Sequence, residues 1–209
     1  MLLALDTSTA YISVAVYDAD TDRVLAARDQ VGPMQHGELL APSITECLAE
    51  AGMVRQDLTA IVAGVGPGPY TGLRVGIVTA RTMGFALDIP VYGVCSLDAM
   101  AVASGLGGSF VVTSDARRKE LFWARYESGA RMEGPFVDRP GDVPSDGPVV
   151  GLGPSLYPDH FDESAAPSYP LAAHLARAVA AERVEIVDAE PIYLRRPDAV
   201  TPGPPKKVS

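Results

Sequence analysis

A glycine-rich stretch, GVGPGPYTGLRVG at residues 64–76, has the residue types of a phosphate-binding loop. Glycines let the backbone approach a ligand closely, and the N–H groups at the start of a following helix attract anions. However, the stretch lacks the Lys-Ser/Thr ending of a P-loop, and its spacing differs from the GxGxxG of dinucleotide-binding turns. Two interpretations therefore stay open: a weak anion site, and a turn whose role is structural.

The helix that we expect after this loop, over about residues 72–87 with Thr71 as its N-cap, carries small residues at every fourth position. They are Gly72, Gly76, Ala80 and Gly84, with Leu73, Ile77 and Leu87 beside them. Such a stripe lets another element approach closely, although each interior glycine costs about 1 kcal/mol of helix stability. The stripe predicts close packing, either inside the chain's own core or against a partner protein.

Charged residues form a second candidate site, around a predicted turn between two strands. Asp115, Arg117, Arg118 and Glu120 lie in this turn, and Arg74 lies one turn into the helix after the glycine loop. A solvated, salt-bridged turn is one interpretation. The other is contact with an anion or with a partner's carboxylate, because a guanidinium binds both through paired hydrogen bonds.

Metal and nucleophile chemistry finds little support in the sequence. Cys47 and Cys95 lie in apolar surroundings without CxxC spacing, so we expect buried free thiols. His36, His160 and His174 share no metal-ligand spacing, and no GxSxG nucleophile elbow is present. We therefore expect neither a metal site nor a serine hydrolase triad.

The composition limits the classes of partner. The chain has 209 residues, a hydrophobic content of 47% and a formal net charge of −9. A protein that binds nucleic acid on its own needs a cationic surface, so we do not expect the isolated chain to bind RNA or DNA tightly. Asp6 comes too early for the apolar region of a signal peptide, and no apolar run approaches the ~18 residues of a membrane helix. We expect a cytoplasmic protein without membrane contact.

Hydrophobic patterns predict the elements that position these residues. Strands are expected at 2–5, 11–18, 23–30, 58–66, 89–96 and 148–153, with two more over 109–127, and helices at 36–51, 72–87, 96–105 and 171–182. Pro42 indicates either a later start of the first helix, near Ser43, or a kink. Residues 128–170 are rich in Pro, Gly, Ser and Asp and are expected to be mostly loop, the segment 201–209 is expected to be disordered, and no internal repeat of fixed period is visible. The alternation predicts an α/β fold with a mixed sheet.

Several segments resemble the TsaB family, also called YeaZ, of bacterial threonylcarbamoyladenosine biosynthesis. They are LALDTSTAYISVAVYD, GVGPGPYTGLRVGIVTARTMGFALDIPVYGV and SDARRKELFWARY, together with the ending AEPIYLRRP. The resemblance implies an actin-like, Hsp70-like ATPase fold (ASKHA, ribonuclease H-like), with two lobes of mixed sheets flanked by helices. It implies an N-terminal lobe over 1–104, a smaller, degenerate C-terminal lobe over 105–197, and a disordered tail over 198–209.

In that superfamily, the residues Asp6, Thr7, Ser8 and Thr9 stand at the first phosphate loop. In the sister family TsaD, the catalytic subunit, an HxxxH pair binds a metal, and Ser96 and Met100 occupy those two places here. Neither is a competent ligand for a catalytic cation. Vestigial or interface contacts with a nucleotide or anion are expected at Asp6, Ser8, Thr9, Arg74, Asp115 and Arg117.

The resemblance therefore implies a non-catalytic subunit. It would bind a TsaD-like catalytic protein, joined by a TsaE-like ATPase, in a complex that makes N6-threonylcarbamoyladenosine at position 37 of tRNAs reading ANN codons. We expect no cofactor of its own, with ATP and a metal belonging to the partner subunits, tRNA contact only through the complex, and a homodimer when the chain is alone. The alternative is an ATPase or carbamoyl-type transferase of the same fold that acts alone; a metallopeptidase is disfavoured for want of ligands.

The resemblance also assigns the partner interface to the two N-terminal helices. The expected interface residues are Leu39, Leu40, Ser43, Cys47, Gly72, Leu73, Gly76, Ile77, Ala80 and Gly84. This expectation requires that the stripe of small residues is exposed on the isolated chain.

Overall fold

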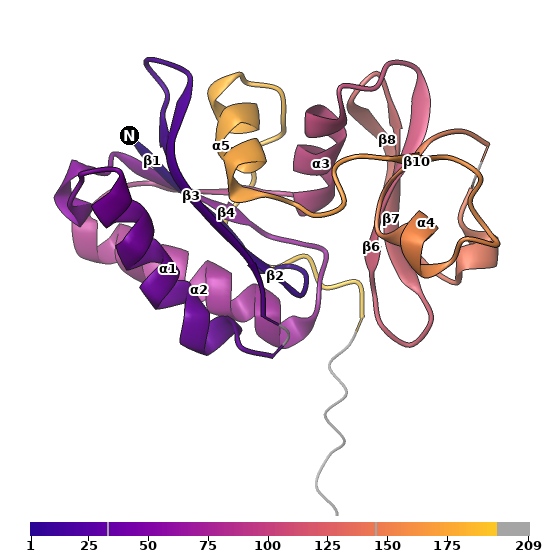
Figure 1. The fold of residues 1–209 in the computed structure, drawn as a ribbon, viewed down its shortest axis with the longest axis horizontal. Coiled ribbons are helices and arrows are strands. Elements are labelled where there is room, and N and C mark those ends of the chain that lie inside the picture. Colours follow the sequence, from indigo (N-terminus) through magenta and orange to yellow (C-terminus); the bar gives the residue numbers. More distant parts are fainter. Residues whose placement is uncertain (33, 145, 196–209) are drawn as a thin grey trace, which may run out of the picture.

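A computed structural model describes residues 1–32, 34–144 and 146–195, which form two lobes built on two five-stranded mixed sheets (Figure 1). The first sheet contains β1 (Leu2–Asp6), β2 (Tyr11–Asp18), β3 (Arg23–Val31), β4 (Ala60–Gly64) and β5 (Val91–Val94). Its strand order is β3-β2-β1-β4-β5. β2 runs antiparallel to both of its neighbours, β1 and β3, whereas β1, β4 and β5 run parallel to one another. The three strands predicted at 2–5, 11–18 and 23–30 are confirmed as β1, β2 and β3, which form an antiparallel meander.

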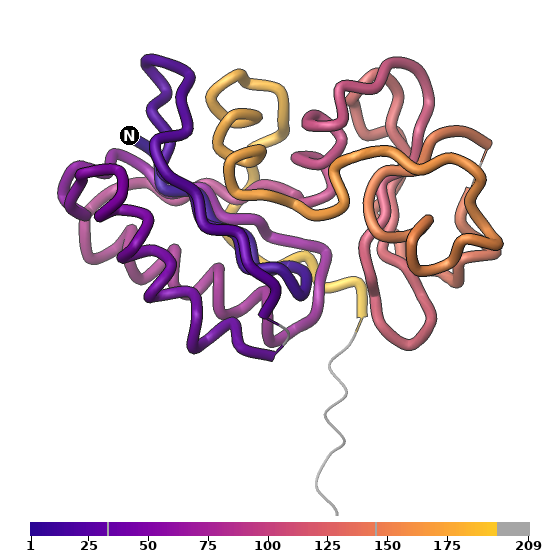
Figure 2. Tube along the Cα trace, viewed as in Figure 1, coloured from indigo at the N-terminus to yellow at the C-terminus, as the bar shows by residue number. Residues whose placement is uncertain are grey.

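Helices cover both faces of this first sheet, with α1 (His36–Glu50) and α2 (Tyr70–Leu87) on one face and α5 (Ala172–Ala180) on the other. α3 (Ser96–Ser104) follows β5, and a 3-10 helix, η1 (Arg55–Asp57), precedes β4. The short α4 (Gly153–Leu156) and the 3-10 helix η2 (Pro140–Asp142) belong to the second lobe. Side chains alternate between the two faces of a strand. Leu3 and Leu5 of β1 therefore join the core under α1 and α2, whereas Ala4 joins the core under α5. Figure 2 shows α1 and α2 running together on one side of the sheet and α5 on the other.

The second sheet contains β6 (Ser109–Asp115), β7 (Leu121–Glu127), β8 (Ala130–Asp138), β9 (Val149–Gly151) and β10 (Ser164–Ala165), in the order β10-β9-β6-β7-β8. β6, β7 and β8 are antiparallel neighbours, and β9 runs parallel to both β6 and β10. α3 lies between the sheets, because its Ala99 packs in the core of the first sheet while Leu97 and Met100 pack with the second. The α/β fold with mixed sheets that the sequence pattern predicted is confirmed, and it has the two lobes that the resemblance implied.

Three sequence predictions need correction. α1 runs unbroken from His36 through Pro42, so the later start near Ser43 is wrong. α2 begins at Tyr70 with Pro69 as its N-cap residue, ahead of the predicted N-cap Thr71. β8, α4 and β10 lie in the segment that was expected to be mostly loop. β8 escaped detection because it is an exposed edge strand without clean alternation of buried and exposed residues.

The predicted division of the chain also changes. α5 was assigned with the C-terminal lobe over 105–197, but its buried residues Ala172, Leu175 and Ala176 pack against the first sheet. The following segment also returns to this sheet, where Val187 and Gly93 exchange backbone hydrogen bonds of 2.9 Å. The predicted disordered tail lies outside the described residues, as do Arg196, Lys206 and Lys207. Within the described part of the chain, none of the helices combines the length and the apolar character that a bilayer crossing requires.

Candidate functional site

Asp6 ends β1 at the position of the superfamily's first phosphate loop, and only 1% of its surface is exposed. Its Oδ1 accepts hydrogen bonds from the backbone N–H and the hydroxyl of Ser8, both at 2.7 Å, and its Oδ2 accepts one from the Ser96 hydroxyl at 2.6 Å. Burial raises the pKa of this carboxyl, while these hydrogen bonds act in the opposite direction. Asp6 therefore ties the turn after β1 to the start of α3.

The glycine loop closes over this turn. A Cβ on Gly64 would overlap Asp6 Oδ2, and a Cβ on Gly68 would overlap the carbonyl oxygen of Ser8. Only glycine permits this approach of loop and turn. The loop therefore has a structural role at Asp6 and Ser8, which are buried beneath it, and contact of these two residues with a nucleotide or anion stays a prediction. Thr9 is also buried, but it lines a cavity described below.

The start of α2 is fastened to the same turn through Thr7. The Thr7 hydroxyl donates to the carbonyl oxygen of Gly72 at 2.8 Å and accepts from the N–H of Gly76 at 3.1 Å. His36 Nε2 donates to the carbonyl oxygen of Thr9 at 2.7 Å, which attaches the start of α1. Both long helices thus begin at the turn after β1.

The residues at the places of the metal-binding pair do not fit a metal. The Ser96 hydroxyl is committed to Asp6, and Met100 is fully buried in the core of the second lobe. Burial raises the pKa of the neighbouring Cys95 to about 12, so this residue is a thiol at neutral pH. Among the described residues, no group of three or more His, Cys, Asp or Glu side chains is arranged to hold a cation.

The stripe of small residues on α2 faces the chain's own first sheet. A Cβ on Gly72 would lie 2.7 Å from the carbonyl oxygen of Thr7, and a Cβ on Gly84 would overlap Val91 of β5. The predicted interface residues that the fold buries are Leu40, Ser43, Cys47, Gly72, Leu73, Gly76, Ile77, Ala80 and Gly84, and Leu39 is half-buried against the same core. The prediction that these residues face a partner is therefore wrong: the stripe allows helix–sheet contact within one chain.

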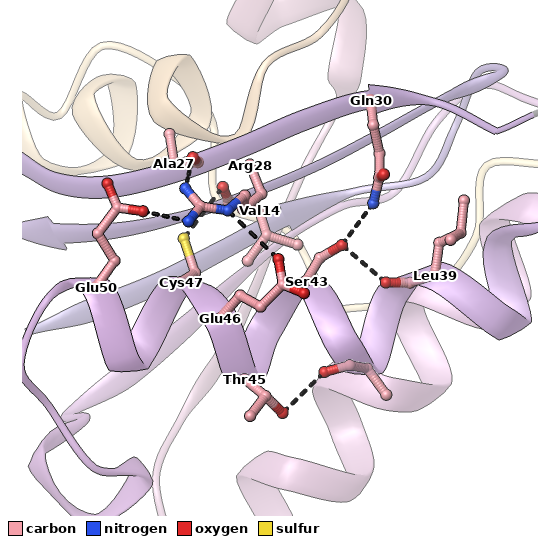
Figure 3. A network of polar contacts seen from close by, with 11 residues as sticks. Val14, Ala27, Arg28, Gln30, Leu39, Ser43, Thr45, Glu46, Cys47 and Glu50 are labelled. Carbon is pink, nitrogen blue, oxygen red and sulfur yellow. Dashed lines mark hydrogen bonds and ion pairs between the residues drawn. The ribbon is translucent and has the colours of Figure 1, made fainter.

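Polar contacts show the same orientation for α1 (Figure 3). Gln30 of β3 donates to the Ser43 hydroxyl at 2.7 Å, and that hydroxyl donates to the Leu39 carbonyl oxygen at 2.7 Å. The Cys47 thiol lies 3.6 Å from the carbonyl oxygen of Val14 on β2. Thr45, by contrast, lies on the side of α1 that faces away from the sheet.

The outer sides of α1 and α2 form an apolar depression of about 890 Å³, which we call the α1/α2 groove. Its lining residues are Ala41, Ile44, Thr45, Leu48, Ala49, Met53, Val54, Arg55, Gln56, Thr79, Thr82, Met83, Ala86 and Leu87. The sequence analysis missed this surface. Its signal was a second row of small residues on α1, where Ala41, Thr45 and Ala49 recur at every fourth position and are exposed.

The charged candidates gather at the end of the molecule where α2 begins. Arg74 is hydrogen-bonded to the Tyr70 hydroxyl and lies 5.1 Å from the centre of the Tyr70 ring. Arg117 lies beside Tyr70 in the wall of a shared cavity. Asp115 Oδ1 accepts a 2.8 Å hydrogen bond from the N–H of Arg117, and the two side chains form an ion pair at 3.4 Å. The interpretation of residues 115–120 as a salt-bridged turn is confirmed.

Comparison with known proteins places this geometry in a family. The family model described as TsaD, tRNA N6-adenosine threonylcarbamoyltransferase, matches residues 30–151. An uncharacterized protein of Mycobacterium tuberculosis (strain H37Rv) is 43% identical over 204 residues, covering 95% of this chain and 93% of that protein. A Mycobacterium leprae relative is 42% identical over 205 residues, but the chain spans only 56% of its length.

Two further comparisons carry a family name. The tRNA threonylcarbamoyladenosine biosynthesis protein TsaB of Escherichia coli (strain K12) is 28% identical over 222 residues, covering 93% of this chain and 94% of that protein. The solved structure of YeaZ from Pseudomonas aeruginosa superposes with a TM-score of 0.78 at 30% identity, covering 92% of this chain and 99% of that one. Because the family model matches more than half of the chain and the solved YeaZ matches nearly all of it, the chain belongs to the TsaB (YeaZ) family.

Proposed function

We propose that this chain is a non-catalytic subunit of a cytoplasmic complex that makes N6-threonylcarbamoyladenosine at position 37 of tRNAs reading ANN codons. It binds a TsaD-like catalytic protein through the α1/α2 groove. The observation that carries the proposal is this apolar groove of about 890 Å³ on the exposed side of two helices that are firmly anchored to their own sheet. The buried turn at Asp6 supports a role without catalysis.

Small side chains suit the α1/α2 groove to helix docking. Ala41, Thr45 and Ala49 leave the outside of α1 smooth, so a partner helix can approach closely. Val54 and Met83 offer larger apolar contacts at the margins. Two helices of a related fold would complete a four-helix contact, and a second copy of this chain would occupy the same groove when the catalytic partner is absent. ATP and a metal then belong to the TsaD-like protein and a TsaE-like ATPase, and tRNA joins through the assembly.

The test is a matched pair of substitutions near the ends of two helices. Ala49→Glu places a carboxylate in the α1/α2 groove, whereas Ala180→Glu places one at the exposed end of α5, away from the groove. Burying an unpaired carboxylate in an interface costs about 3 kcal/mol or more. Ala49→Glu should therefore weaken binding to the TsaD-like protein at least about 100-fold by calorimetry, and it should abolish adenosine modification by the reconstituted complex. Ala180→Glu should change neither.

The alternative, an enzyme that acts alone, has a separate outcome. Calorimetry of the isolated chain with Mg-ATP should give no micromolar binding and no hydrolysis. ATP turnover by the isolated chain, or full modification activity with Ala49→Glu, would contradict the proposed role.

A further inference from the structure

The hairpin tip between β6 and β7 projects three basic side chains. Arg117, Arg118 and Lys119 have φ angles of 60°, 55° and 61°, so three consecutive non-glycine residues are left-handed. This conformation is disfavoured for residues with a Cβ. All three residues are exposed. The tip therefore curls at some cost in energy and presents its cationic side chains to solvent.

Two tyrosines lie beside this tip. Tyr70, the first residue of α2, stacks on Tyr193 of the C-terminal segment, with ring centres 4.9 Å apart. Arg74 lies over the Tyr70 ring, and the residues Tyr70 and Tyr193 are 40% and 39% exposed. Solvent-accessible aromatic side chains next to arginines are features on which proteins stack the bases of single-stranded nucleic acids.

Two cavities connect the hairpin tip with the tyrosines. One, of about 180 Å³, is lined by Gly68, Pro69, Tyr70, Ala116, Arg117, Arg118, Phe122, Tyr193, Leu194 and Arg195. The other, of about 570 Å³, is lined by Thr9, Ala10, Met34, His36, Gly37, Pro69, Tyr70, Thr71, Gly72, Val75 and Arg117. Pro69, Tyr70 and Arg117 line both, so the two cavities are adjacent, and together we call them the basic track.

Cationic side chains line and border the basic track, although the whole chain has a formal net charge of −9: Arg117, Arg118 and Arg195 line it, and Arg74 and Lys119 lie beside it. Arg117 and Arg195 have acidic partners, Asp115 and Glu120. Within the described part of the chain, neither Arg74 nor Lys119 forms an ion pair with a carboxylate. A local cationic excess therefore remains for an anionic ligand.

The layout of these groups fits a strand better than a mononucleotide. Most of the cations line the cavity of about 180 Å³, which is below the roughly 300 Å³ of ordinary small-molecule sites. The larger cavity contains Arg117 as its arginine, and Lys119 lies outside both. Cations distributed along a depression, with aromatic rings between them, match a phosphodiester backbone with unstacked bases.

We propose that the basic track and the hairpin tip beside it bind single-stranded RNA, with Arg117 in the track and Lys119 at the tip contacting phosphates and the Tyr70–Tyr193 pair contacting a base. The inference deepens the proposed function and rests on it for the identity of the RNA, the anticodon stem-loop of a tRNA. The surface itself stands on its geometry. Because the rest of the chain is acidic, the chain alone binds weakly and at low salt, and the assembled complex supplies the remaining affinity.

The test measures fluorescence anisotropy of a labelled anticodon stem-loop RNA over a series of salt concentrations, with the chain alone and with its TsaD-like partner. Arg117→Asn with Lys119→Asn removes two charges from the tip and keeps residues that tolerate positive φ. Arg23→Asn with Arg183→Asn removes two exposed charges from the first lobe, at the start of β3 and just after α5, and neither residue lines the basic track. The tip pair should weaken binding about tenfold and reduce the slope of log K against log salt by about 1.4, as for two lost phosphate contacts. The control pair should do neither.

A third variant isolates stacking. Tyr193→Leu should weaken RNA binding about tenfold by removing a base platform, and it should leave the salt slope unchanged. Equal effects of the tip pair and the control pair would overturn the proposal, as would absence of RNA binding at low salt. Displacement of the RNA by ATP, with ATP affinity lost in the tip pair, would assign the track to a mononucleotide instead. If the partner does not bind, the proposed function fails, but the RNA measurement on the chain alone still decides this inference.

Discussion

The sheets of the two lobes share one strand order and one set of strand directions, but the segments that connect their parallel strands differ. From the antiparallel edge inward, the first sheet is β3-β2-β1-β4-β5 and the second is β8-β7-β6-β9-β10, with matching strand directions. In the first lobe, α1 with 15 residues and α2 with 18 residues fill the crossovers. In the second lobe, the equivalent crossovers contain η2 with three residues and α4 with four. Among the described residues, crossover helices of this length, and the α1/α2 groove that they form, belong to the first lobe alone.

Even the turns after the central strands correspond. Asp6 ends β1 and accepts a 2.7 Å hydrogen bond from the N–H two residues later, and Asp115 ends β6 and accepts the same bond at 2.8 Å. The first turn is sealed beneath the glycine loop, whereas the second carries the exposed tip residues of the basic track. One turn geometry therefore serves as an anchor in one lobe and as a surface feature in the other.

The largest expected effect on stability compares the side of α2 that packs on the first sheet with the side that lines the α1/α2 groove. Ala80 is fully buried against the first sheet, and Ala86 is exposed in the α1/α2 groove. Ala80→Glu buries an unpaired carboxylate and should lower the free energy of unfolding by about 4 kcal/mol. Ala86→Glu should change it by less than about 0.5 kcal/mol. Urea unfolding followed by circular dichroism measures both.

The fluorescence of Trp123 adds a probe confined to the second lobe. Because α3 packs in the cores of both lobes, the Trp123 transition should shift together with the circular dichroism transition in Ala80→Glu. A destabilised first lobe beside an unchanged Trp123 transition would mean that the lobes unfold separately.

A smaller effect compares the two equivalent aspartates. Asp6→Ala leaves the Ser8 and Ser96 donors without their acceptor in a buried site and should cost about 2 kcal/mol. Asp115→Ala should cost about 0.5 kcal/mol, because its partner Arg117 reaches water. Similar costs for the two variants would contradict the contrast between a sealed and an open turn.

The raised pKa of Asp6 makes its contribution depend on pH. A group whose folded-state pKa lies above its usual value of 3.8 contributes its full stability below pH 3.8 and loses it as the pH rises through the folded-state pKa. The difference in stability between the wild type and Asp6→Ala should therefore be larger in acid than at neutral pH. A difference that grows with rising pH would mean that the folded state favours the ionised carboxylate.

Sequence patterns predicted the first lobe well because its elements are long and buried. Apolar runs such as Leu2–Leu5 and 58–66 correspond to strands covered on both faces, and such strands carry continuous hydrophobicity. In the second lobe, the sequence predicted β6, β7 and β9 but missed β8 and β10. β8 contains a Gly-Pro pair and no clean alternation, and the crossovers of this lobe are rich in Pro and Gly, so local pattern could not distinguish these segments from loop.

The candidate site shows a different limit. A stripe of small residues indicates close packing, but it does not say which element approaches, and Val91 of the chain's own sheet occupies that place at Gly84. The exposed row at Ala41, Thr45 and Ala49 is equally regular, but no interface was predicted from it. Likewise, Tyr193 joins Tyr70 across more than a hundred residues, a contact that no local spacing can reveal.

The smallest expected effect tests whether α5, late in the sequence, belongs to the first lobe. His174 lies on α5, where burial and the nearby Arg177 lower its pKa from 6.5, against an opposing effect of Asp29. Between pH 6.5 and the lowered pKa, the unfolded chain binds a proton at this histidine and the folded chain does not. The free energy of unfolding should therefore fall as the pH drops through this range. His174→Gln should remove this part of the pH dependence, measured as urea midpoints at neutral and mildly acidic pH. His160→Gln, an exposed change in the second lobe, should retain it. An unchanged pH dependence in His174→Gln would mean that α5 does not hold this side chain against the first lobe in solution.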